Sequence, residues 1–321
     1  MNVLFLTEFG KRTGIGHLSR CRNLALSLSK LSGFNSYLFC LSKEDTPDIG
    51  DFRFISIISG SLAELGSYCT KTKIDYIVCD LAQNCDEADL TIFSNLETPI
   101  ITVDDITPRR LLSTLNFYPP IQQVNTMDWS GYSGKNHIGW PYYILSPNLV
   151  KQKNPVRIRK QLLISLGGSD AFDITERLMK VLPDLASTYD LKFIIGPLSN
   201  VKKFRILEVC PNNIVVYKNP ESLYTIMTQC DYAIVTYGVT LFELAYLQVP
   251  TVAITTHDDH ELSGKSFWGT YNSILNVSNC SKNLGDEIIA KMKLLESGNN
   301  FIFPHFGENI NSAFVSAIMD L

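Results

Sequence analysis

Short apolar runs alternate with amphipathic segments through the first third of the chain. The apolar runs predict β-strands at residues 3–6, 36–41, 54–58, 74–79 and 99–103. The segments between them predict helices at residues 17–31, 61–72 and 86–96, where apolar residues recur at helical spacing. Strands that alternate with helices are typical of a doubly wound domain built on a parallel sheet.

The same pattern begins again after a less regular stretch at residues 106–160. The basic end of that stretch, residues 151–160, contains Pro155 and is interpreted as a linker. Beyond it we expect strands at 162–166, 191–195, 214–217, 232–235 and 250–254, and helices at 175–185, 266–270, 284–296 and 309–319. The sequence thus predicts two doubly wound α/β domains, residues 1–150 and 151–304, with an active site in a cleft between them. Residues 305–321 are expected to form a helix that packs back on the first domain.

A glycine loop joins the first predicted strand to the first predicted helix. Gly14 and Gly16 allow the backbone to turn sharply and to approach a ligand closely. His17 follows them in the first turn of the helix. The positive end of the helix dipole disfavours a charged imidazole, so we expect His17 to stay neutral and able to accept a proton. The alternative is that His17 is only a polar residue at a helix start.

Carboxylates follow two of the predicted strands. Asp80 ends the run at 74–79, and Asp104 and Asp105 follow the run at 99–103. Ligands of doubly wound sheets gather outside the carboxyl ends of the strands, which makes these side chains candidates for chemistry together with His17. Each aspartate could instead cap a helix or form a turn.

A second glycine turn lies in the predicted second domain. Residues 237–243 read Tyr-Gly-Val-Thr-Leu-Phe-Glu and follow a buried strand. The amides of this turn and the start of the next helix could hold a diphosphate. Glu243 would then lie where a carboxylate can bind a ribose diol. The alternative is structural, because Thr240 and Glu243 also have the spacing of a capping box.

Composition and charge restrict the ligands that the chain can take. The 321 residues are 45% hydrophobic and 19% charged, with a net charge of −4, which disfavours general binding to nucleic acids or anionic membranes. The eight cysteines include no Cys-x-x-Cys pair, and no leader or membrane-spanning run is recognised, so we expect a cytoplasmic protein. Residues 257–261 (His-Asp-Asp-His-Glu) hold metal-ligand types, but adjacent ligands in one short loop rarely surround an ion, so no metal site is expected.

Taken in order, these motifs resemble those of the GT-B nucleotide-sugar enzymes. Within that group the chain is similar to the UDP-sugar hydrolases of pseudaminic acid biosynthesis and to their spore-coat polysaccharide relatives. The matching motifs are Gly14-x-Gly16-His17-x-x-Arg20, Asp104-Asp105, Gly139-Trp140-x-Tyr142, Gly167-Gly168-Ser169-Asp170, and Gly238-x-Thr240 with Glu243.

The resemblance implies a GT-B fold and hydrolysis of a nucleotide-activated sugar. His17 would activate water for attack at the anomeric carbon, and Asp80 and Asp105 would orient the sugar. The products would be a free amino-deoxy sugar and a nucleoside diphosphate, UDP in preference to CDP, with no cofactor and no metal ion. The nucleotide contacts that it implies are Gly14, Gly16, Arg20, Gly167, Gly168, Ser169, Asp170, Tyr217, Tyr237, Gly238, Val239, Thr240 and Glu243. The sequence does not determine the oligomeric state.

Two departures from the hydrolase pattern keep other functions open. The hydrolases follow their mid-domain aspartate with His and Tyr, whereas Leu81 and Ala82 follow Asp80 here. A late Asn-Gln pair is also missing, with residues 258–261 near its place. One alternative is a GT-B glycosyltransferase in which His17 deprotonates an acceptor hydroxyl. The other is a non-catalytic nucleotide-sugar binding subunit.

Overall fold

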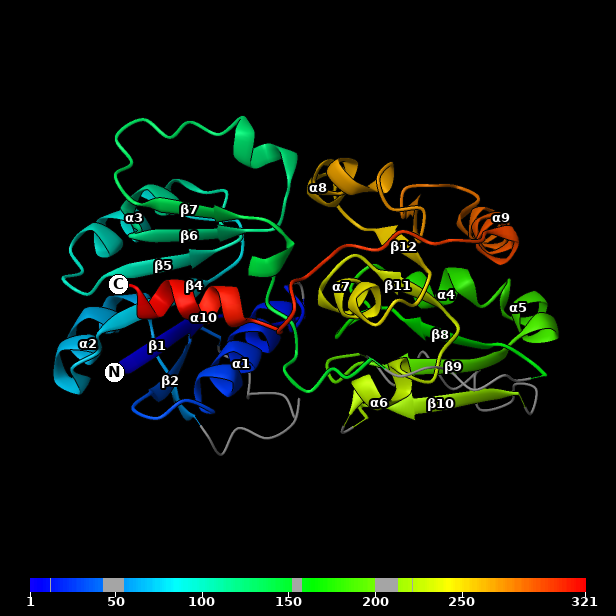
Figure 1. Cartoon of the computed structure of the whole chain (residues 1–321), viewed down its shortest axis with the longest axis horizontal. Helices are drawn as coiled ribbons and strands as arrows, with labels where there is room; N and C mark the ends of the chain where they lie inside the picture. The colour runs from blue at the N-terminus through cyan, green and yellow to red at the C-terminus, as the bar shows by residue number, and fades with distance from the viewer. Residues whose placement is uncertain (12, 43–54, 152–157, 200–212, 221) are drawn as a thin grey trace. The chain divides into compact units, whose positions relative to one another are not determined.

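The computed structural model of the chain describes residues 1–11, 13–42, 55–151, 158–199, 213–220 and 222–321 (Figure 1). These residues form two compact units. The first comprises residues 1–42, 55–147 and 305–321, and the second comprises residues 148–304, in each case as far as the structure describes them. Most of the predicted linker at 151–160, and the start of the strand expected at 54, lie outside the described residues.

The first unit is built on a parallel sheet of seven described strands in the order β3-β2-β1-β4-β5-β6-β7. Neighbouring strands run the same way, so the central strands are buried on both faces and consist largely of apolar residues. The strand order reverses between β1 and β4. The strands are β1 (Asn2–Thr7), β2 (Asn35–Cys40), β3 (Ser56–Ser59), β4 (Tyr76–Asp80), β5 (Ile100–Val103), β6 (Leu115–Tyr118) and β7 (Lys135–Ile138).

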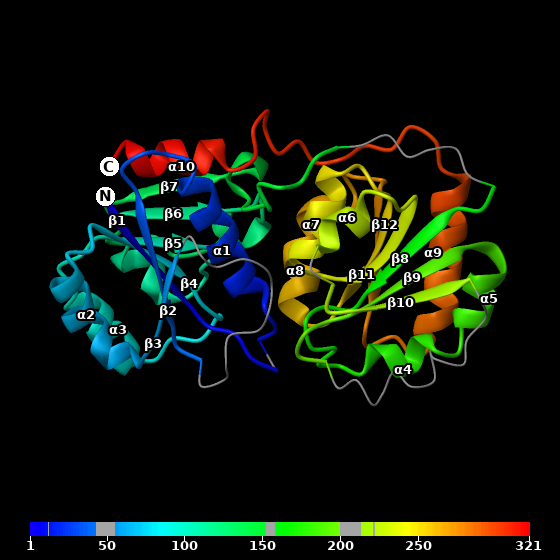
Figure 2. The same cartoon turned by 90° about the horizontal axis from the view of Figure 1, so that it is seen from below.

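Helices cover both faces of this sheet (Figure 2). Leu65, Cys69 and Phe93 of α2 and α3 pack on one face, against Leu4 and Leu6 of β1 among others. The other face is covered by α1 and α10. The α-helices are α1 (Gly16–Leu28), α2 (Leu65–Thr72), α3 (Glu87–Ser94) and α10 (Ser312–Met319); short 3-10 helices are η1 (Leu62–Glu64), η2 (Pro108–Leu112), η3 (Gln122–Asn125) and η4 (Trp140–Tyr142).

The last helix of the chain belongs to the first unit. Phe314 of α10 is fully buried and stacks on Phe117 of β6, with 3.9 Å between ring centroids. Asn311 lies just before α10. Its side-chain oxygen accepts from the N–H of Leu145, and its side-chain nitrogen donates to the carbonyl of Leu145 and, at 2.8 Å, to Ser27 Oγ. Segments far apart in the sequence therefore close the same core.

The second unit repeats this topology with six described strands in the order β10-β9-β8-β11-β12-β13, all parallel. Its order reverses between β8 and β11. The strands are β8 (Gln161–Ser165), β9 (Asp190–Ile195), β10 (Ile214–Lys218), β11 (Tyr232–Thr236), β12 (Thr251–Thr255) and β13 (Ile274–Ser278). The helices are α4 (Ile174–Leu178), α5 (Leu182–Thr188), α6 (Leu223–Met227), α7 (Val239–Tyr246), α8 (Asp258–Trp268) and α9 (Leu284–Ser297).

Several elements differ from those that the sequence predicts. The stretch 106–160 contains β6 and β7, and β13 is also additional. The helix expected at 175–185 is two helices, because Pro183 lacks the N–H that would bond to the carbonyl of Met179. The helix expected at 266–270 overlaps only the end of α8, which begins at Asp258 with three acidic residues in its first turn. A membrane-spanning helix is not found among the residues that the structure describes.

We predict that Phe314→Ala lowers the free energy of unfolding by about 3–5 kcal/mol, because it removes a fully buried ring and leaves a cavity beside Phe117. Urea denaturation followed by tryptophan fluorescence measures this, since Trp129 and Trp140 belong to the first unit. The matched control is Met319→Ala on the same helix, where the side chain is 57% exposed. Its effect should stay within about 0.5 kcal/mol. Equal effects of the two changes would contradict the packing of α10.

Candidate functional site

His17 and Asp80 lie at the point where the strand order of the first sheet reverses. β1 and β4 pair in parallel with Thr7 opposite Asp80, the last residue of β4. The chain leaves β1 through the glycine loop and enters α1, so the first turn of α1 stands at the end of β4. Such a reversal is where ligands bind in doubly wound sheets.

The glycine loop makes a tight turn before α1. Gly10 and Gly14 exchange two backbone hydrogen bonds, with N···O distances of 3.1 and 2.7 Å, and Gly14 has φ +70°, a conformation that favours glycine. Helix α1 begins at Gly16, which makes His17 its second residue. No side chain caps this helix start, and its first turn holds no acidic residue.

The side chains of His17, Arg20, Asp80 and Asp104 form one charged cluster. His17 Nδ1 lies 2.7 Å from Asp80 Oδ1. Arg20 binds both oxygens of Asp80, from Nη2 at 2.6 Å and from Nε at 2.7 Å, and its Nη1 lies 3.4 Å from Asp104 Oδ2. His17 and Arg20 are three residues apart on α1 and therefore share one helix face.

Burial and charge act against each other at the two aspartates. Burial by itself would raise the pKa of Asp80, but Arg20 and then His17 bring that pKa below its usual value. Desolvation raises the pKa of the half-buried Asp104, the neighbouring Asp80 acts in the same direction, and Arg20 opposes them. Asp80 is therefore ionised at neutral pH and only accepts hydrogen bonds. Nδ1 of His17 lies 2.7 Å from Asp80 Oδ1 and 3.1 Å from Arg20 Nη2. An ionised Asp80 accepts from Nδ1 only in the tautomer with a proton on Nδ1, and in that tautomer the lone pair of the ring is on Nε2.

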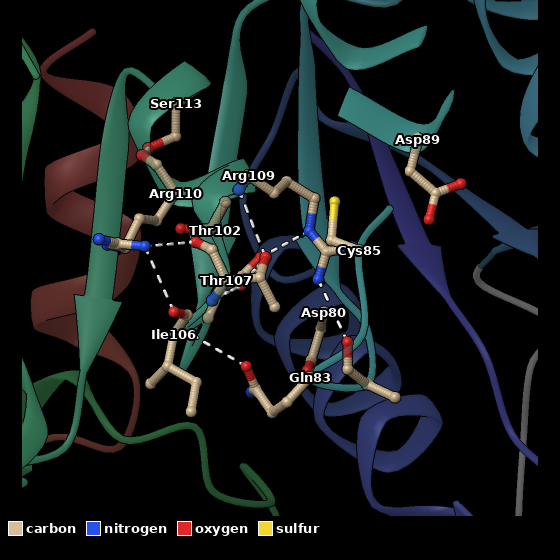
Figure 3. Close-up of polar contacts among 12 residues, drawn as sticks. Asp80, Gln83, Cys85, Asp89, Thr102, Ile106, Thr107, Arg109, Arg110 and Ser113 are labelled. Atoms are coloured by element: carbon tan, nitrogen blue, oxygen red, sulfur yellow. Dashed lines mark hydrogen bonds and ion pairs between the residues drawn. The ribbon is translucent and has the colours of Figure 1, made fainter. Parts of the chain in front are cut away.

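Asp105 takes part in a different network from Asp80, with Thr107 and Arg109, two residues that Figure 3 labels. Its Oδ1 accepts hydrogen bonds from the backbone N–H and hydroxyl of Thr107, at 2.8 and 2.7 Å. Its Oδ2 accepts from Arg109 Nε at 2.5 Å. Both Asp105 and Arg109 are almost completely buried. Of the two consecutive aspartates, Asp104 joins the His17 cluster, and the carboxylate of Asp105 holds the start of η2.

Side chains tie together the loops that follow β1, β4 and β5. Glu8 Oε1 accepts from the backbone N–H of Ala82 at 2.7 Å. Gln83 donates to the carbonyl of Asp104 and accepts from the N–H of Ile106 at 2.9 Å (Figure 3). Asp104 itself has φ +55°, which is uncommon for a residue with a side chain. These bonds hold Asp80 and Asp104 at fixed positions relative to α1.

In the second unit the two predicted glycine motifs follow β8 and β11, the neighbouring strands at which the order reverses. Gly167 has φ +83°, and the carbonyl of Gly168 accepts from Leu198 N at 2.8 Å. Gly196 follows β9, and a Cβ there would collide with the carbonyl oxygens of Gly167 and Gly168. Sequence reasoning did not single out Gly196, although the Gly-Pro pair after a strand marks a turn.

The remaining residues of the second unit's predicted site are placed differently. Asp170 accepts from the backbone N–H groups of Ile174 and Thr175, at 3.0 and 3.3 Å, and so caps α4. Ser169 lies in the same turn as the two glycines. Tyr217 lies on the edge strand β10, separated from β8 by β9, so it does not join the glycine motifs directly.

Helix α7 starts at the second glycine motif without a capping box. The N-cap residue is Gly238, so Val239 and Thr240 are the first two residues of the helix. Gly238 has φ 159° and ψ −165°, a conformation nearly restricted to glycine. No side chain caps α7, and its first turn has no acidic residue, which leaves backbone N–H groups for a ligand. The capping-box interpretation of Thr240 and Glu243 is therefore wrong. Glu243 is buried within the helix.

Residues 257–261 lie at the start of α8. His257 is the N-cap residue, and His260 stacks on Tyr237 with 4.6 Å between ring centroids. Burial lowers the pKa of His260 to about 4, with a smaller contribution from His257, so His260 is neutral at pH 7. Within the described residues, no cluster of three or more His, Cys, Asp or Glu side chains is arranged to hold a metal ion.

Sequence reasoning did not predict the contacts of Arg20. It assigned Arg20 to the nucleotide, and in the structure the guanidinium binds Asp80 and Asp104. A signal was present, because Arg20 lies between Leu18 and Leu24 on the apolar face of α1, and a buried arginine requires a counter-charge. Trp140, from the resembling glycine–aromatic segment, contacts the C-terminal segment, with 5.4 Å between its ring centroid and that of Phe306.

No known family model matches this chain. It is 24% identical over 280 residues to uncharacterized protein MJ1062 of Methanocaldococcus jannaschii, which covers 79% of this chain and 55% of that protein. It is 22% identical over 278 residues to the pseudaminic acid cytidylyltransferase and UDP-2,4-diacetamido-2,4,6-trideoxy-beta-L-altropyranose hydrolase of Helicobacter pylori, covering 83% of this chain and 47% of that protein. The chain spans about half the length of these curated relatives.

Solved structures resemble the chain over both units. MurG of Acinetobacter baumannii superposes with a TM-score of 0.61 at 15% identity, and the alignment covers 100% of both chains. The spinosyn forosaminyltransferase SpnP superposes with a TM-score of 0.63 at 12% identity, covering 92% of this chain and 91% of that one. Identities this low establish the fold alone. With its two parallel-sheet α/β domains, the chain has the GT-B fold.

Proposed function

We propose that this protein hydrolyses a nucleotide-activated sugar, with His17 as the general base. The observation that carries the proposal is the 2.7 Å contact between His17 Nδ1 and Asp80 Oδ1. Asp80 is held by Arg20, so the imidazole is fixed by a carboxylate that is itself fixed. A positioned base of this kind typically accelerates a reaction by about 10²–10⁴-fold.

In the proposed reaction a water oxygen attacks the anomeric carbon and loses a proton to Nε2 of His17. The bond between that carbon and the diphosphate oxygen breaks, and its electron pair stays with the diphosphate. The products are a free sugar and a nucleoside diphosphate, and the imidazolium returns its proton to solvent. Asp80 stabilises the charged ring that forms during the attack, as carboxylates do in other acid–base pairs.

The second unit would bind the nucleotide. The uncapped start of α7 and the glycine turn before it offer N–H groups and a partial positive charge, which suit a diphosphate and stabilise the charge that it gains on leaving. Other helices of this unit place carboxylates at their own starts, such as Asp170 for α4 and the acidic first turn of α8. The hydrolase named for the Helicobacter pylori relative supports the same class of substrate. UDP is the favoured nucleotide.

Transfer to another acceptor is the second candidate, and one observation favours it. Leu81 and Ala82 stand where the resembling hydrolases have His and Tyr. Leu81 is buried in the core below the sheet edge, and the backbone of Ala82 is bonded to Glu8 and Arg109. The residues after Asp80 are therefore engaged in structure. A glycosyltransferase would use the same His17 to deprotonate an acceptor hydroxyl.

The central test is His17→Asn, assayed with a panel of UDP- and CDP-linked amino sugars and no acceptor, with products followed by proton NMR. Asparagine keeps a polar side chain but cannot accept the proton, so turnover should fall by about 10²–10⁴-fold while UDP affinity changes little. If His17 is the base, the rate of the wild-type protein rises with pH as the ring loses a proton. This rise should be absent in the variant.

His305→Asn is the control, since His305 is an exposed histidine in the same unit. Near-normal turnover by the His17 variant would refute the base assignment. Wild-type turnover that requires an added acceptor would favour the transferase. Binding without turnover under any condition would favour a non-catalytic subunit.

Asp80→Asn should affect both turnover and acid stability. The change removes the closer of the two counter-charges of Arg20 and leaves only Asp104, at 3.4 Å, which should lower the free energy of unfolding at pH 7 by about 3 kcal/mol. The folded-state pKa of Asp80 is lowered, so its stabilising contribution is present above the unfolded value of about 3.9 and is lost as the pH falls below it. Urea denaturation should therefore show the difference from wild type shrinking between pH 7 and pH 3. A constant difference, or one matched by the exposed Asp320→Asn control, would contradict the pairing.

Glu243→Gln tests the ribose contact. Loss of a charge-assisted hydrogen bond should weaken UDP binding roughly tenfold or more, as measured by calorimetry. Because Gly238 is the N-cap of α7, the change removes no helix cap. The control is Glu97→Gln, an exposed glutamate of the first unit. Unchanged UDP affinity in the Glu243 variant would remove this residue from the nucleotide site.

A further inference from the structure

A small pocket opens at the carboxyl edge of the first sheet, on the opposite side of the β4 end from His17. Its volume is about 170 Å³, and its wall includes Glu8, Leu41, Leu62, Leu81, Asn84 and Arg109. Asp80 faces α1, whereas the next residue, Leu81, belongs to the core under α2 and α3. We call this the Arg109 pocket. Nothing in the proposed hydrolysis uses it.

Arg109 brings a buried cation to the pocket wall. Its side chain is about 2% exposed. Nε donates to Asp105, Nη2 donates to the carbonyl of Ala82 at 3.3 Å, and the guanidinium lies 5.5 Å from the ring centroid of Phe93. A guanidinium carries five N–H donors, and these hydrogen bonds use two of them, so Arg109 can also donate to a ligand oxygen in the pocket.

The charges around the pocket disfavour an anion. Asp105 already neutralises Arg109, and two further carboxylates, Glu8 and Asp89, line the same wall. Figure 3 shows Asp89 and Cys85 beyond the guanidinium of Arg109, on the side away from Arg110. Carboxylates accept hydrogen bonds from hydroxyl or amide groups of a ligand, and the side-chain amide of Asn84 can both donate and accept.

Three leucines form the apolar part of the wall, and the space is small. The side chains of Leu41, Leu62 and Leu81 offer contacts for a methyl group or a ring face. Pockets for drug-sized ligands hold roughly 300–1,000 Å³, so this one admits a single small ring. We propose that the Arg109 pocket binds a neutral, monosaccharide-sized molecule that carries hydroxyl groups and an acyl or methyl substituent. The oxygen of that substituent accepts from Arg109, and its methyl group packs on the leucines.

The test is a titration of the full chain, labelled at its leucine methyl groups, with N-acetyl-D-glucosamine. The methyl resonances of Leu41, Leu62 and Leu81 should shift and saturate together. D-glucuronate, a sugar ring of similar size with a carboxylate, and inorganic phosphate should shift them far less.

Two substitutions in the pocket wall test the same proposal. Arg109 itself is unsuitable for substitution, because the buried carboxylate of Asp105 would lose its counter-charge. Leu62→Trp fills the pocket and should weaken binding about tenfold or more. Asn84→Ala removes a rim hydrogen bond and should weaken it about three- to tenfold.

Leu31→Trp is the control for Leu62→Trp, since Leu31 is 37% exposed and lies after the far end of α1. It should bind the sugar as wild type does. His17→Asn should bind it as well, which separates this proposal from the proposed hydrolysis. The proposal is overturned if the sugar shifts none of the three leucines, if glucuronate or phosphate shifts them equally, or if both pocket variants keep wild-type affinity.

Discussion

A carboxylate with no exposed surface at the end of β4 determines how the first unit is organised around it. Asp80 is stable there in its ionised form only if it is paired and fully hydrogen-bonded. Arg20 occupies both of its oxygens, and the Nδ1–H of His17 adds a further bond to one of them. This is possible because β1 and β4 are neighbours and α1 follows β1, so the start of the helix meets the end of the strand. The orientation of the His17 ring is thus a consequence of stabilising Asp80.

The two units share a strand order but differ in what they present at its reversal. In the first unit, the charged side chains of Arg20, Asp80 and Asp104 lie with His17 at the point where the strand order reverses. In the second unit, glycine turns and the uncapped start of α7 lie at this point. Charged side chains suit proton transfer, and fixed N–H groups suit an anion that must be bound without being protonated. One fold, used twice, therefore offers two chemically different edges.

The fold class and most central strands could be predicted because their apolar runs are continuous and end at polar residues such as Asp80. Strand β7 could not, because Lys-Asn-His-Ile has no apolar pattern and is held by pairing with β6. At the site, His17 and Asp80 could each be selected, but their contact depends on which strands are neighbours. The choice between Asp104 and Asp105 is also tertiary. Asp104 and Asp105 are consecutive residues, so their side chains point in different directions. Asp104 joins the cluster because its side chain is the one that lies beside Arg20.

The loop after β4 is held by hydrogen bonds that are separate from the pair formed by His17 and Asp80. The N–H of Ala82 is bonded to Glu8, and its carbonyl accepts from Arg109 and from the N–H of Asn84. Gln83 joins the loop to the backbone on both sides of Asp105. All of these bonds lie beyond Asp80 and none involves His17, so the loop is braced independently of the base. Substitutions at positions 81 and 82 can therefore change what lies beside a sugar without moving the pair formed by His17 and Asp80. If His17 acts as the proposed base, loss of the His and Tyr of the resembling hydrolases would change specificity and leave proton transfer in place.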